Sequence, residues 1–425
     1  MLLYCIFNYI LMKKGKVKQN LKLSTIEGSF WAIMYGGGET FLSACAVFLQ
    51  FSAFQISFLS SFPPFIGSCF QLFSASIKNK FKDLKQFVVT MSYIQAILWV
   101  ILVLLLFYKP TYKYVLIWSC IYWTIGTVIQ PAWTAWMGYF VPRRIRARYF
   151  GKRNRIIGFV SFLATLIAGY VLDFFNENML YGFAIIFIAA FLGRTLSAFY
   201  LNKKFNFEEK ETQNLFEYIS SFKNLISEQN KSFYYIIFSS YINFSIMFFG
   251  PLFSIYMLRT MELSVFIYTI NMTLWQVSNF ASSNYFGKLC ERIGDYQVLK
   301  ISTYIIVVLP IPWILLYYLD DQTQIIATFI VSILAGVCFS AYTLSSFNLL
   351  YKISKKEDVI HFSAVVTFIR GAAILLGGIL AGLIVESNYI NQLGKNFNLT
   401  PIHISMMISI FLRFLSIPIL KKINI

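Results

Sequence analysis

Charged residues are scarce in this sequence. Asp, Glu, Lys and Arg together make up 13% of the chain, whereas a soluble domain carries about 25%. Hydrophobic residues reach 58% and the mean hydropathy is +0.66, which is more apolar surface than a soluble globule can bury. The composition therefore excludes a soluble protein and indicates a chain whose solvent is lipid.

Residues that hold metals or perform catalysis are also few. The chain has two histidines, and its six cysteines show neither CxxC nor Cys/His spacing, so no disulfide framework and no metal site is indicated. His361 falls in a predicted cytoplasmic loop and His403 at the outer start of a predicted span, so no histidine–acid pair shares a side. No Gly-x-x-x-x-Gly-Lys-Ser/Thr run for ATP occurs. We predict no metal, no cofactor and no enzymatic activity.

Long apolar runs, in contrast, recur along the whole chain. A helix needs about 20 apolar residues to cross a bilayer, and twelve windows reach this length. The predicted spans are residues 25–49, 54–77, 86–107, 114–139, 156–175, 180–201, 233–258, 264–286, 298–319, 324–350, 363–385 and 402–420. This pattern predicts an all-α membrane protein. The apolar residues 1–12 are too few to span, so they either lie in the interface or precede a true start at Met12.

Basic residues are distributed unevenly about the predicted spans. If both termini are cytoplasmic, the inner segments carry 29 Lys and Arg and the outer loops carry four. The remaining three, Arg194, Arg370 and Arg413, lie inside spans. Because cytoplasmic loops of membrane proteins are enriched in Lys and Arg, we place both termini in the cytoplasm. These loops also account for the net charge of +18 without a nucleic-acid partner.

The two halves of the chain are related in sequence. A shift of 213 residues lays positions 168–173 on 381–386 and Gly37 on Gly250, and a slightly larger shift lays Arg194 on Arg413. Such internal repeats are common in transporters. The predicted parts are a cytoplasmic N-terminal segment (1–23), a six-helix bundle (24–201), a cytoplasmic linker with an amphipathic helix (202–232), a second six-helix bundle (233–420) and a cytoplasmic tail (421–425).

Two predicted cytoplasmic loops carry recognisable motifs. The loop between spans 8 and 9 reads Gly287-x-x-x-Glu291-Arg292-x-Gly294, which is similar to the Gly-x-x-x-Asp-Arg-x-Gly-Arg-Arg loop of the major facilitator superfamily. Its counterpart between spans 2 and 3, residues 74–83, lacks the glycine and the acid–arginine pair.

The loop between spans 4 and 5 is rich in arginine. It contains Pro142, Arg144 and Arg148 and resembles the Pro- and Arg-rich loop of many bacterial members. With twelve spans in two repeated sixes, the chain resembles the superfamily over nearly its whole length. The resemblance implies two pseudo-symmetric six-helix bundles. It also implies a gating role for the residues Gly287, Glu291, Arg292, Gly294, Arg144 and Arg148.

Glu39 is the outstanding polar residue of the predicted spans. It stands near the centre of span 1, on the same helical face as Tyr35, where a charge costs about 2.5–3.5 kcal/mol on insertion scales. The carboxylate either binds a cation or a proton, or it is a neutral, hydrogen-bonded packing group. No acid stands at the matching position of the other half, Leu252.

Amides at a similar depth complete the candidate site, because the resemblance implies that spans 1, 4, 7 and 8 line a central cavity. Each amide could instead make an interhelical hydrogen bond, and Trp136, near Gln130, either lines the site or anchors the interface. The candidate cavity residues are Glu39, Tyr35, Gln130, Trp133, Asn243, Gln276 and Arg370.

The three intramembrane arginines have two interpretations. Arg370 has no counterpart in the repeat, which favours contact with an anionic substrate or with Glu39. Arg194 and Arg413 recur in both halves, which favours a scaffold role with side chains that snorkel to the headgroups.

We therefore predict a secondary active transporter that moves a small solute by alternating access, with proton coupling left open. The alternative is a transporter-like flippase for lipids or amphiphiles, or a membrane sensor. A membrane-embedded transferase is less favoured. The expected partners are a small-molecule substrate, protons and membrane lipid, and the expected state is a monomer in a bacterial inner membrane. Substrate, direction and coupling ion do not follow from the sequence.

Overall fold

A computed structural model describes residues 2–71, 73–108, 111–142, 145–206, 231–353 and 359–423 of the chain. These residues form helices and turns, and none of them lies in a β-strand. Within the same ranges, nine helices are long and apolar enough to cross a membrane. The all-α membrane fold is therefore confirmed, while twelve stays the predicted number of spans.

Three predicted spans fall in helices that are less apolar than these nine. They are α1 (Leu2–Gly37), α3 (Ala53–Gln71) and α12 (Val265–Ile293). The apolar part of α1 is cut short by the glycines at 36–38, α3 contains Pro63 and Pro64, and α12 carries many amide and hydroxyl side chains. Polar residues in membrane helices usually face the protein interior or a water-filled space, so a functional site is expected beside α1 or α12.

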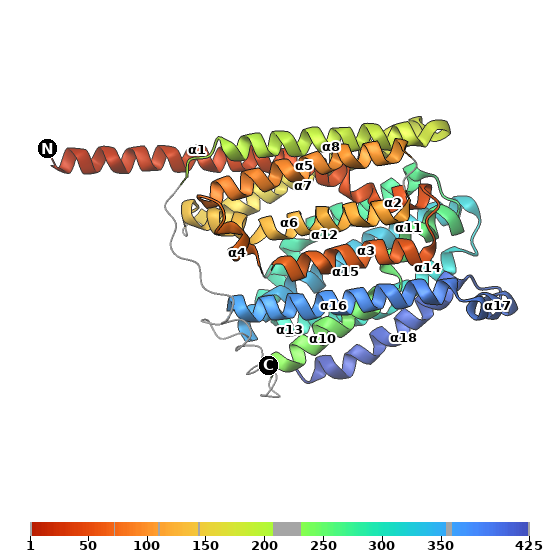
Figure 1. The fold of residues 1–425 in the computed structure, drawn as a ribbon. Coiled ribbons are helices and arrows are strands. Elements are labelled where there is room, and N and C mark those ends of the chain that lie inside the picture. Colours follow the sequence, from red (N-terminus) through yellow and green to blue (C-terminus); the bar gives the residue numbers. More distant parts are fainter. Residues whose placement is uncertain are drawn as a thin grey trace. The chain divides into compact units, whose positions relative to one another are not determined.

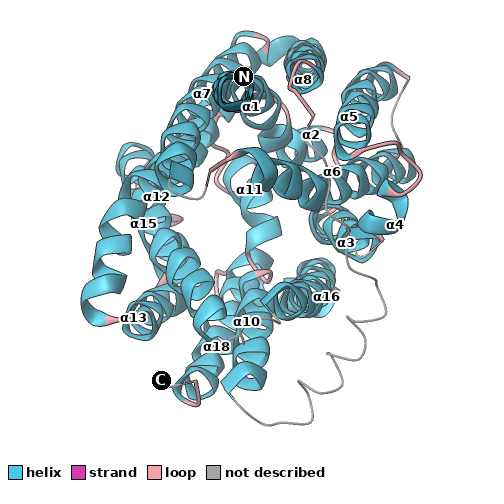
Figure 2. Cartoon of the chain, turned by 90° about the vertical axis from the view of Figure 1, so that its left-hand side faces the viewer, coloured by secondary structure: helices cyan, strands magenta, loops and turns pink. Residues whose placement is uncertain are grey.

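The described residues within 1–42 and 69–213 form a first compact unit. Besides α1, its elements are η1 (Glu39–Phe41), α4 (Ser74–Lys78), α5 (Leu84–Phe107), α6 (Tyr112–Phe140), α7 (Arg146–Phe174), η3 (Asn176–Asn178) and α8 (Met179–Asn202). Figure 1 labels the α-helices among them. Helix α1 packs along α7 and α8, and α5 packs along α6 and α8; Figure 2 shows these helices nearly end on.

Glycines set how closely α1 approaches its neighbours. A Cβ atom at Gly36 would overlap the main-chain carbonyl of Ser161 on α7, and one at Gly38 would lie 2.6 Å from the Cβ of Ala190 on α8. The α-helix ends at Gly37, and the 3₁₀ turn η1 follows with Glu39 as its first residue. Close packing of α1 therefore coincides with the break that positions Glu39.

The described residues within 43–68 and 214–425 form a second compact unit. Besides most of α3 and α12, its elements are α2 (Leu42–Phe48, from Ser43 on), α10 (Lys231–Ile246), η4 (Gly250–Leu252), α11 (Phe253–Ile255), η5 (Tyr256–Thr260), α13 (Asp295–Val308), α14 (Pro310–Leu316), α15 (Asp321–Ile353), α16 (Val359–Glu386), α17 (Asn388–Asn396) and α18 (Pro401–Lys421). Helix α12 packs along α15, and α10 packs along α16 and α18. Most of the predicted linker, residues 207–230, lies outside the described residues.

The second unit repeats the break of the first. Helix α10 ends at Ile246, and the 3₁₀ turn η4 begins at Gly250, the residue that the shift of 213 aligns with Gly37.

Two further helix ends follow local sequence rules. Ser264 caps α12 through the Ile267 N–H at 3.2 Å, and Gly294 ends α12 with a φ of +88°, a conformation that favours glycine.

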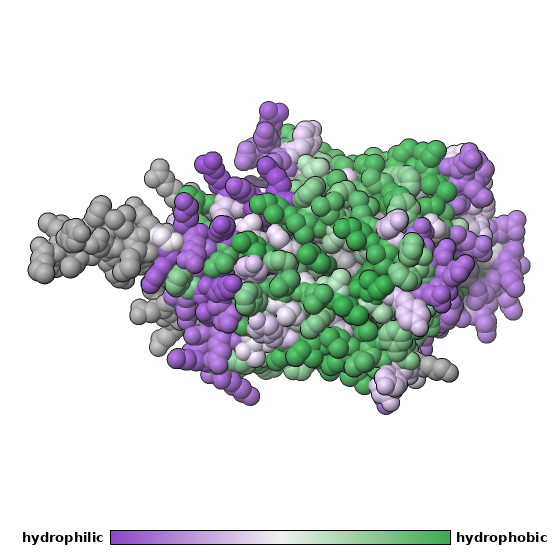
Figure 3. Space-filling view, turned by 90° about the horizontal axis from the view of Figure 1, so that it is seen from above, coloured by the Kyte–Doolittle hydropathy of each residue, from purple (hydrophilic) through white to green (hydrophobic). Residues whose placement is uncertain are grey.

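The outward side chains of the first unit are apolar along the middle of its helices. Exposed examples are Ile97 and Leu104 on α5, Ile167 on α7, and Ile188 and Leu192 on α8. Figure 3 shows a broad hydrophobic band bordered by hydrophilic ends. An apolar surface of this extent would promote aggregation in water, so the protein is an integral membrane protein.

We expect Gly36→Ala to lower the unfolding temperature of the purified protein in detergent, because the added Cβ collides with the Ser161 carbonyl. Overpacking of this kind costs about 1–3 kcal/mol, and thermal unfolding followed by intrinsic fluorescence measures it. The control is Gly151→Ala, at a helical glycine where an added Cβ would meet no atom within 4 Å, which should gain up to about 1 kcal/mol. An unchanged midpoint for Gly36→Ala would contradict the close packing of α1 on α7.

Candidate functional site

Glu39 lies at the helix break of the first unit, as the first residue of η1. Its Oε2 accepts a hydrogen bond of 2.8 Å from the hydroxyl of Tyr122 on α6. Tyr122 is fully buried; it stacks on Trp118 and packs edge-on against Trp99, with centroid distances of 5.1 and 5.2 Å. Glu39 makes no ion pair within the described part of the chain. Such a carboxylate can take up a proton or a cation.

Three more candidates of the first unit lie near this break or on α6. Tyr35, one helical turn before Glu39, is half-buried and stacks on Trp31 at a centroid distance of 5.3 Å. Gln130 is exposed on α6. Trp133 points elsewhere, because its indole Nε1 donates to Glu27 at 3.3 Å.

Glu27 is the centre of a buried charge cluster that the sequence did not reveal. Its carboxylate is 3.1 Å from the Arg153 guanidinium of α7 and 3.3 Å from the Lys204 amine, just beyond α8. Ser197 of α8 also donates to it, at 3.4 Å. The Arg153 guanidinium in turn lies over the ring of Trp133, 4.7 Å from its centroid. The cluster joins α1, α6, α7 and α8.

Lys204 keeps its charge in this buried setting. Burial lowers the pKa of Lys204 to about 8, and the Glu27 carboxylate opposes that shift. The amine is therefore mostly protonated at neutral pH. One signal in the sequence pointed to Glu27, since it is one of two acids within the first predicted span. Its partners could not be found, because they follow it by 126 and 177 residues.

Arg194 and Arg413 do not snorkel, so that interpretation was wrong. Both are buried, with 5% and 3% of their surface exposed. Arg194 donates to Gln95 at 2.8 Å and to Ser92 at 2.9 Å, both on α5. Each arginine donates hydrogen bonds to a neighbouring helix, α5 for Arg194 and α13 for Arg413. The sequence alone does not show these contacts. Trp136, for which interfacial anchoring was considered, is likewise fully buried.

The second unit has its own polar group. Asn243 on α10 donates to the Ser239 carbonyl at 2.7 Å and to the Tyr342 hydroxyl on α15 at 3.4 Å. Arg370 is half-buried on α16. Gln276 is half-buried on α12. The structure thus pairs Asn243 with Tyr342, and a cavity that Asn243 and Arg370 share with Glu39 stays a prediction.

The predicted gating residues lie at helix ends. Gly294 separates α12 from α13, and Gly287 lies within α12 two turns earlier. Glu291 and Arg292 are exposed and form no ion pair among the described residues. Arg148 is exposed on α7, and Arg144 lies outside the described residues. Their role in gating stays a prediction.

The buried acid of this loop is Asp295, the residue directly after the motif. It pairs with Lys352 of α15 and accepts a hydrogen bond of 2.9 Å from Asn348. These contacts tie the start of α13 to the end of α15. This ion pair lies directly beyond the motif, whose own acid, Glu291, forms no ion pair among the described residues.

We expect Glu27→Gln to destabilise the protein by about 3–5 kcal/mol, because it leaves two buried cations without their anion. The folded Lys204 has a pKa of about 8, below the value of an unfolded lysine. Without the Glu27 carboxylate the pKa of Lys204 falls further, so the variant's amine loses its proton below pH 8 and the uncompensated charge is relieved. The deficit should therefore be larger well below pH 8 than above it. Thermal unfolding in detergent on both sides of this pH measures the effect.

The matched control for this test is Glu177→Gln, at an exposed acid in η3. It removes the same charge and should leave the unfolding temperature unchanged. Equal midpoints for Glu27→Gln and the parent protein would mean that the cluster contributes nothing to stability.

Comparison with known proteins addresses family and fold. The sequence matches the family model of the Major Facilitator Superfamily over residues 29–378, and no curated protein sequence matches it. A solved mutant of the nucleoside transporter NupG superposes with a TM-score of 0.73 at 15% identity, over 96% of this chain and 100% of that one.

Two further structures are similar at comparable coverage. A bacterial homologue of the iron transporter ferroportin, in an inward-facing state, gives a TM-score of 0.71 at 12% identity, over 95% and 98% of the two chains. A D-xylose-proton symporter gives 0.69 at 11% identity, over 94% and 97%. At these identities the likeness establishes the fold.

Proposed function

Because the chain belongs to the major facilitator superfamily, we propose that it is a secondary transporter that moves a small solute by alternating access. In such a mechanism two helical bundles rock about a central site that opens to one side at a time. Solved transporters of nucleosides and of D-xylose with protons share its fold, which supports the proposal. We place it as a monomer in a bacterial inner membrane, with both termini cytoplasmic.

The observation that carries the proposal is the Glu39–Tyr122 pair. A carboxylate within a membrane helix, held by one hydroxyl at 2.8 Å, has far fewer compensating contacts than Glu27. Because proton uptake removes its charge, Glu39 changes its interactions with Tyr122 and with any cationic solute when it is protonated. We propose that Glu39 is the proton- or cation-binding group and that Tyr122 positions it.

The break after α1 supports this assignment. Where a membrane helix is interrupted, unpaired main-chain groups and polar side chains become available to solutes, and transporter sites are often built at such breaks. Glu39, Thr40 and Phe41 form the 3₁₀ turn at this break. Tyr35 lies one helical turn before Glu39, so an aromatic and an acidic side chain lie close to the same helix break.

Uptake into proteoliposomes of a panel of small solutes, with and without an imposed pH gradient, tests the proposal. We expect the parent protein to accumulate a solute in response to the gradient. Glu39→Gln should abolish gradient-driven accumulation and keep exchange of the same solute. Tyr122→Phe removes one hydrogen bond to a carboxylate and should lower the rate by about tenfold.

Glu177→Gln is the matched control and should transport like the parent protein, because this acid is exposed. Gradient-driven uptake that survives Glu39→Gln unchanged would remove the proton role. If the parent protein moves no solute of the panel, the flippase or sensor interpretation replaces the transporter.

A further inference from the structure

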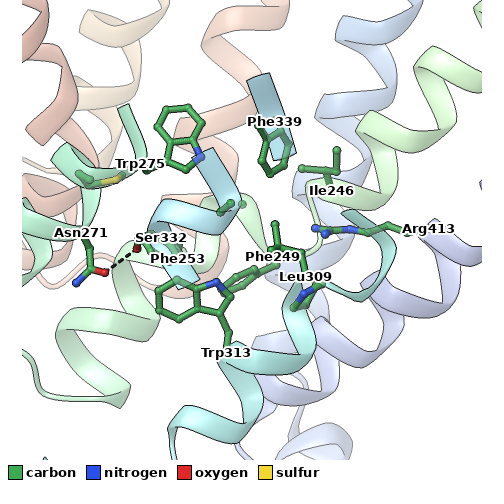
Figure 4. Close-up of a pocket in the computed structure, with 14 residues that line it drawn as sticks. Ile246, Phe249, Phe253, Asn271, Trp275, Leu309, Trp313, Ser332, Phe339 and Arg413 are labelled. Carbon is green, nitrogen blue, oxygen red and sulfur yellow. Dashed lines mark hydrogen bonds between the residues drawn. The ribbon is translucent and has the colours of Figure 1, made fainter. Parts of the chain in front are cut away.

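A cavity of about 240 Å³ lies within the second unit. Its walls are largely aromatic, and Figure 4 labels Phe249, Trp275, Trp313 and Phe339 among them. All of its lining residues belong to the second unit, on α10, η4, α11, α12, α14, α15, α18 and the adjoining turns. A dry apolar cavity of about 150 Å³ is large enough to bind benzene. This cavity therefore has room for a substituted ring.

One charged side chain, Arg413 of α18, lines the cavity. It extends towards the aromatic walls in Figure 4. Its Nη1 donates to the Ile306 carbonyl at 2.8 Å, while its Nε has no hydrogen-bond partner in the part of the chain that the structure describes. No acidic side chain of the described residues lies within ion-pair distance. A buried cation without an anion is unfavourable, so Arg413 is a ready site for a negative charge.

The corresponding arginine of the first unit is fully compensated. Arg194 precedes Arg413 by one repeat and donates to Gln95, Ser92 and Ser197, at 2.8, 2.9 and 3.3 Å. Ser197 in turn donates to the Glu27 carboxylate at 3.4 Å. The first unit thus supplies hydrogen bonds and an anion to its buried arginine.

The second unit keeps the arginine and loses these partners. Ser416 occupies the place of Ser197, and its hydroxyl donates to the Arg413 carbonyl at 2.6 Å instead. The position of Glu27 corresponds to Ser240 at the shift of 213, and the buried Ser240 hydroxyl has no hydrogen-bond partner within the described ranges. Among the described residues no carboxylate pairs with Arg413, and a cavity lies beside this cation.

We propose that this cavity binds a small organic carboxylate with a flat apolar body. The planar guanidinium of Arg413 matches a carboxylate in geometry and charge, and the aromatic walls match a ring. An inorganic anion would leave these walls unfilled. Across the cavity, the Ser332 hydroxyl and the Asn271 amide, 2.6 Å apart, form a polar end for a second substituent. Binding here does not depend on transport.

Calorimetric titration of the full-length protein in detergent with benzoate tests the proposal. Benzamide has the same shape without the charge, and chloride has the charge without the ring. We expect saturable benzoate binding, tighter than benzamide binding by at least about tenfold, the effect of one charge-assisted hydrogen bond. Chloride at the concentration of benzoate should not displace it.

Variants connect the binding to the cavity. Arg413→Gln should weaken benzoate binding by at least about tenfold. Ala335→Phe, which places a ring in the cavity and keeps the guanidinium, should abolish it. Arg155→Gln removes the same charge from an exposed position on α7 and should bind like the parent. Thermal unfolding identifies any variant that does not fold. If Arg413→Gln does not fold, the benzoate affinity of Ala335→Phe tests the proposal.

Three results would overturn the proposal. They are absence of saturable benzoate binding to the parent protein, binding of benzamide or chloride as tight as that of benzoate, and unchanged benzoate affinity in a folded Arg413→Gln or Ala335→Phe. Since no uptake is measured, each of these results leaves the transport proposal to its own experiment.

Discussion

An ionised side chain that leaves water loses its hydration, and only opposite charges or hydrogen bonds replace it. The buried ionisable groups of this protein differ in how completely this requirement is met. Glu27 has two cations, two hydroxyls and an indole N–H within reach. Among the described residues, Glu39 has a single hydroxyl as its hydrogen-bond partner, and Arg413 has a single carbonyl. The completeness of this compensation separates groups that hold helices together from groups that are available to a ligand.

The sequence was sufficient for the fold, because a chain that must satisfy its peptide groups without water has few architectures. Apolar windows and the internal repeat led to the superfamily, which the family match over residues 29–378 shows. The helix breaks could be anticipated only in part. The glycines after Tyr35 signal an end of α1, whereas the π turn η5, at residues 256–260, has no comparable signal.

The site was predicted less completely, and the reason is distance along the chain. Glu39 stands out as an acid in an apolar window, but its partner Tyr122 follows 83 residues later, and tyrosines are common in this chain. For the same reason the partners of Glu27 could not be found in the sequence. It is also why the buried residues Arg194 and Arg413 were interpreted as contacts to lipid headgroups. Side-chain pairing between helices is a property of the packed bundle, so a single sequence does not contain it.

The matched interruptions η1 and η4 bear on ancestry. A gene duplication copies every feature present at the time, and both repeats break their first helix close to an aligned glycine, Gly37 or Gly250. The carboxylate is not repeated, because Leu252 occupies the position of the second repeat that aligns with Glu39. The interruption is therefore the element that the two copies share, and the carboxylate belongs to one copy. Lineages built on this scaffold can change their chemistry by substituting a single position at a break that already exists.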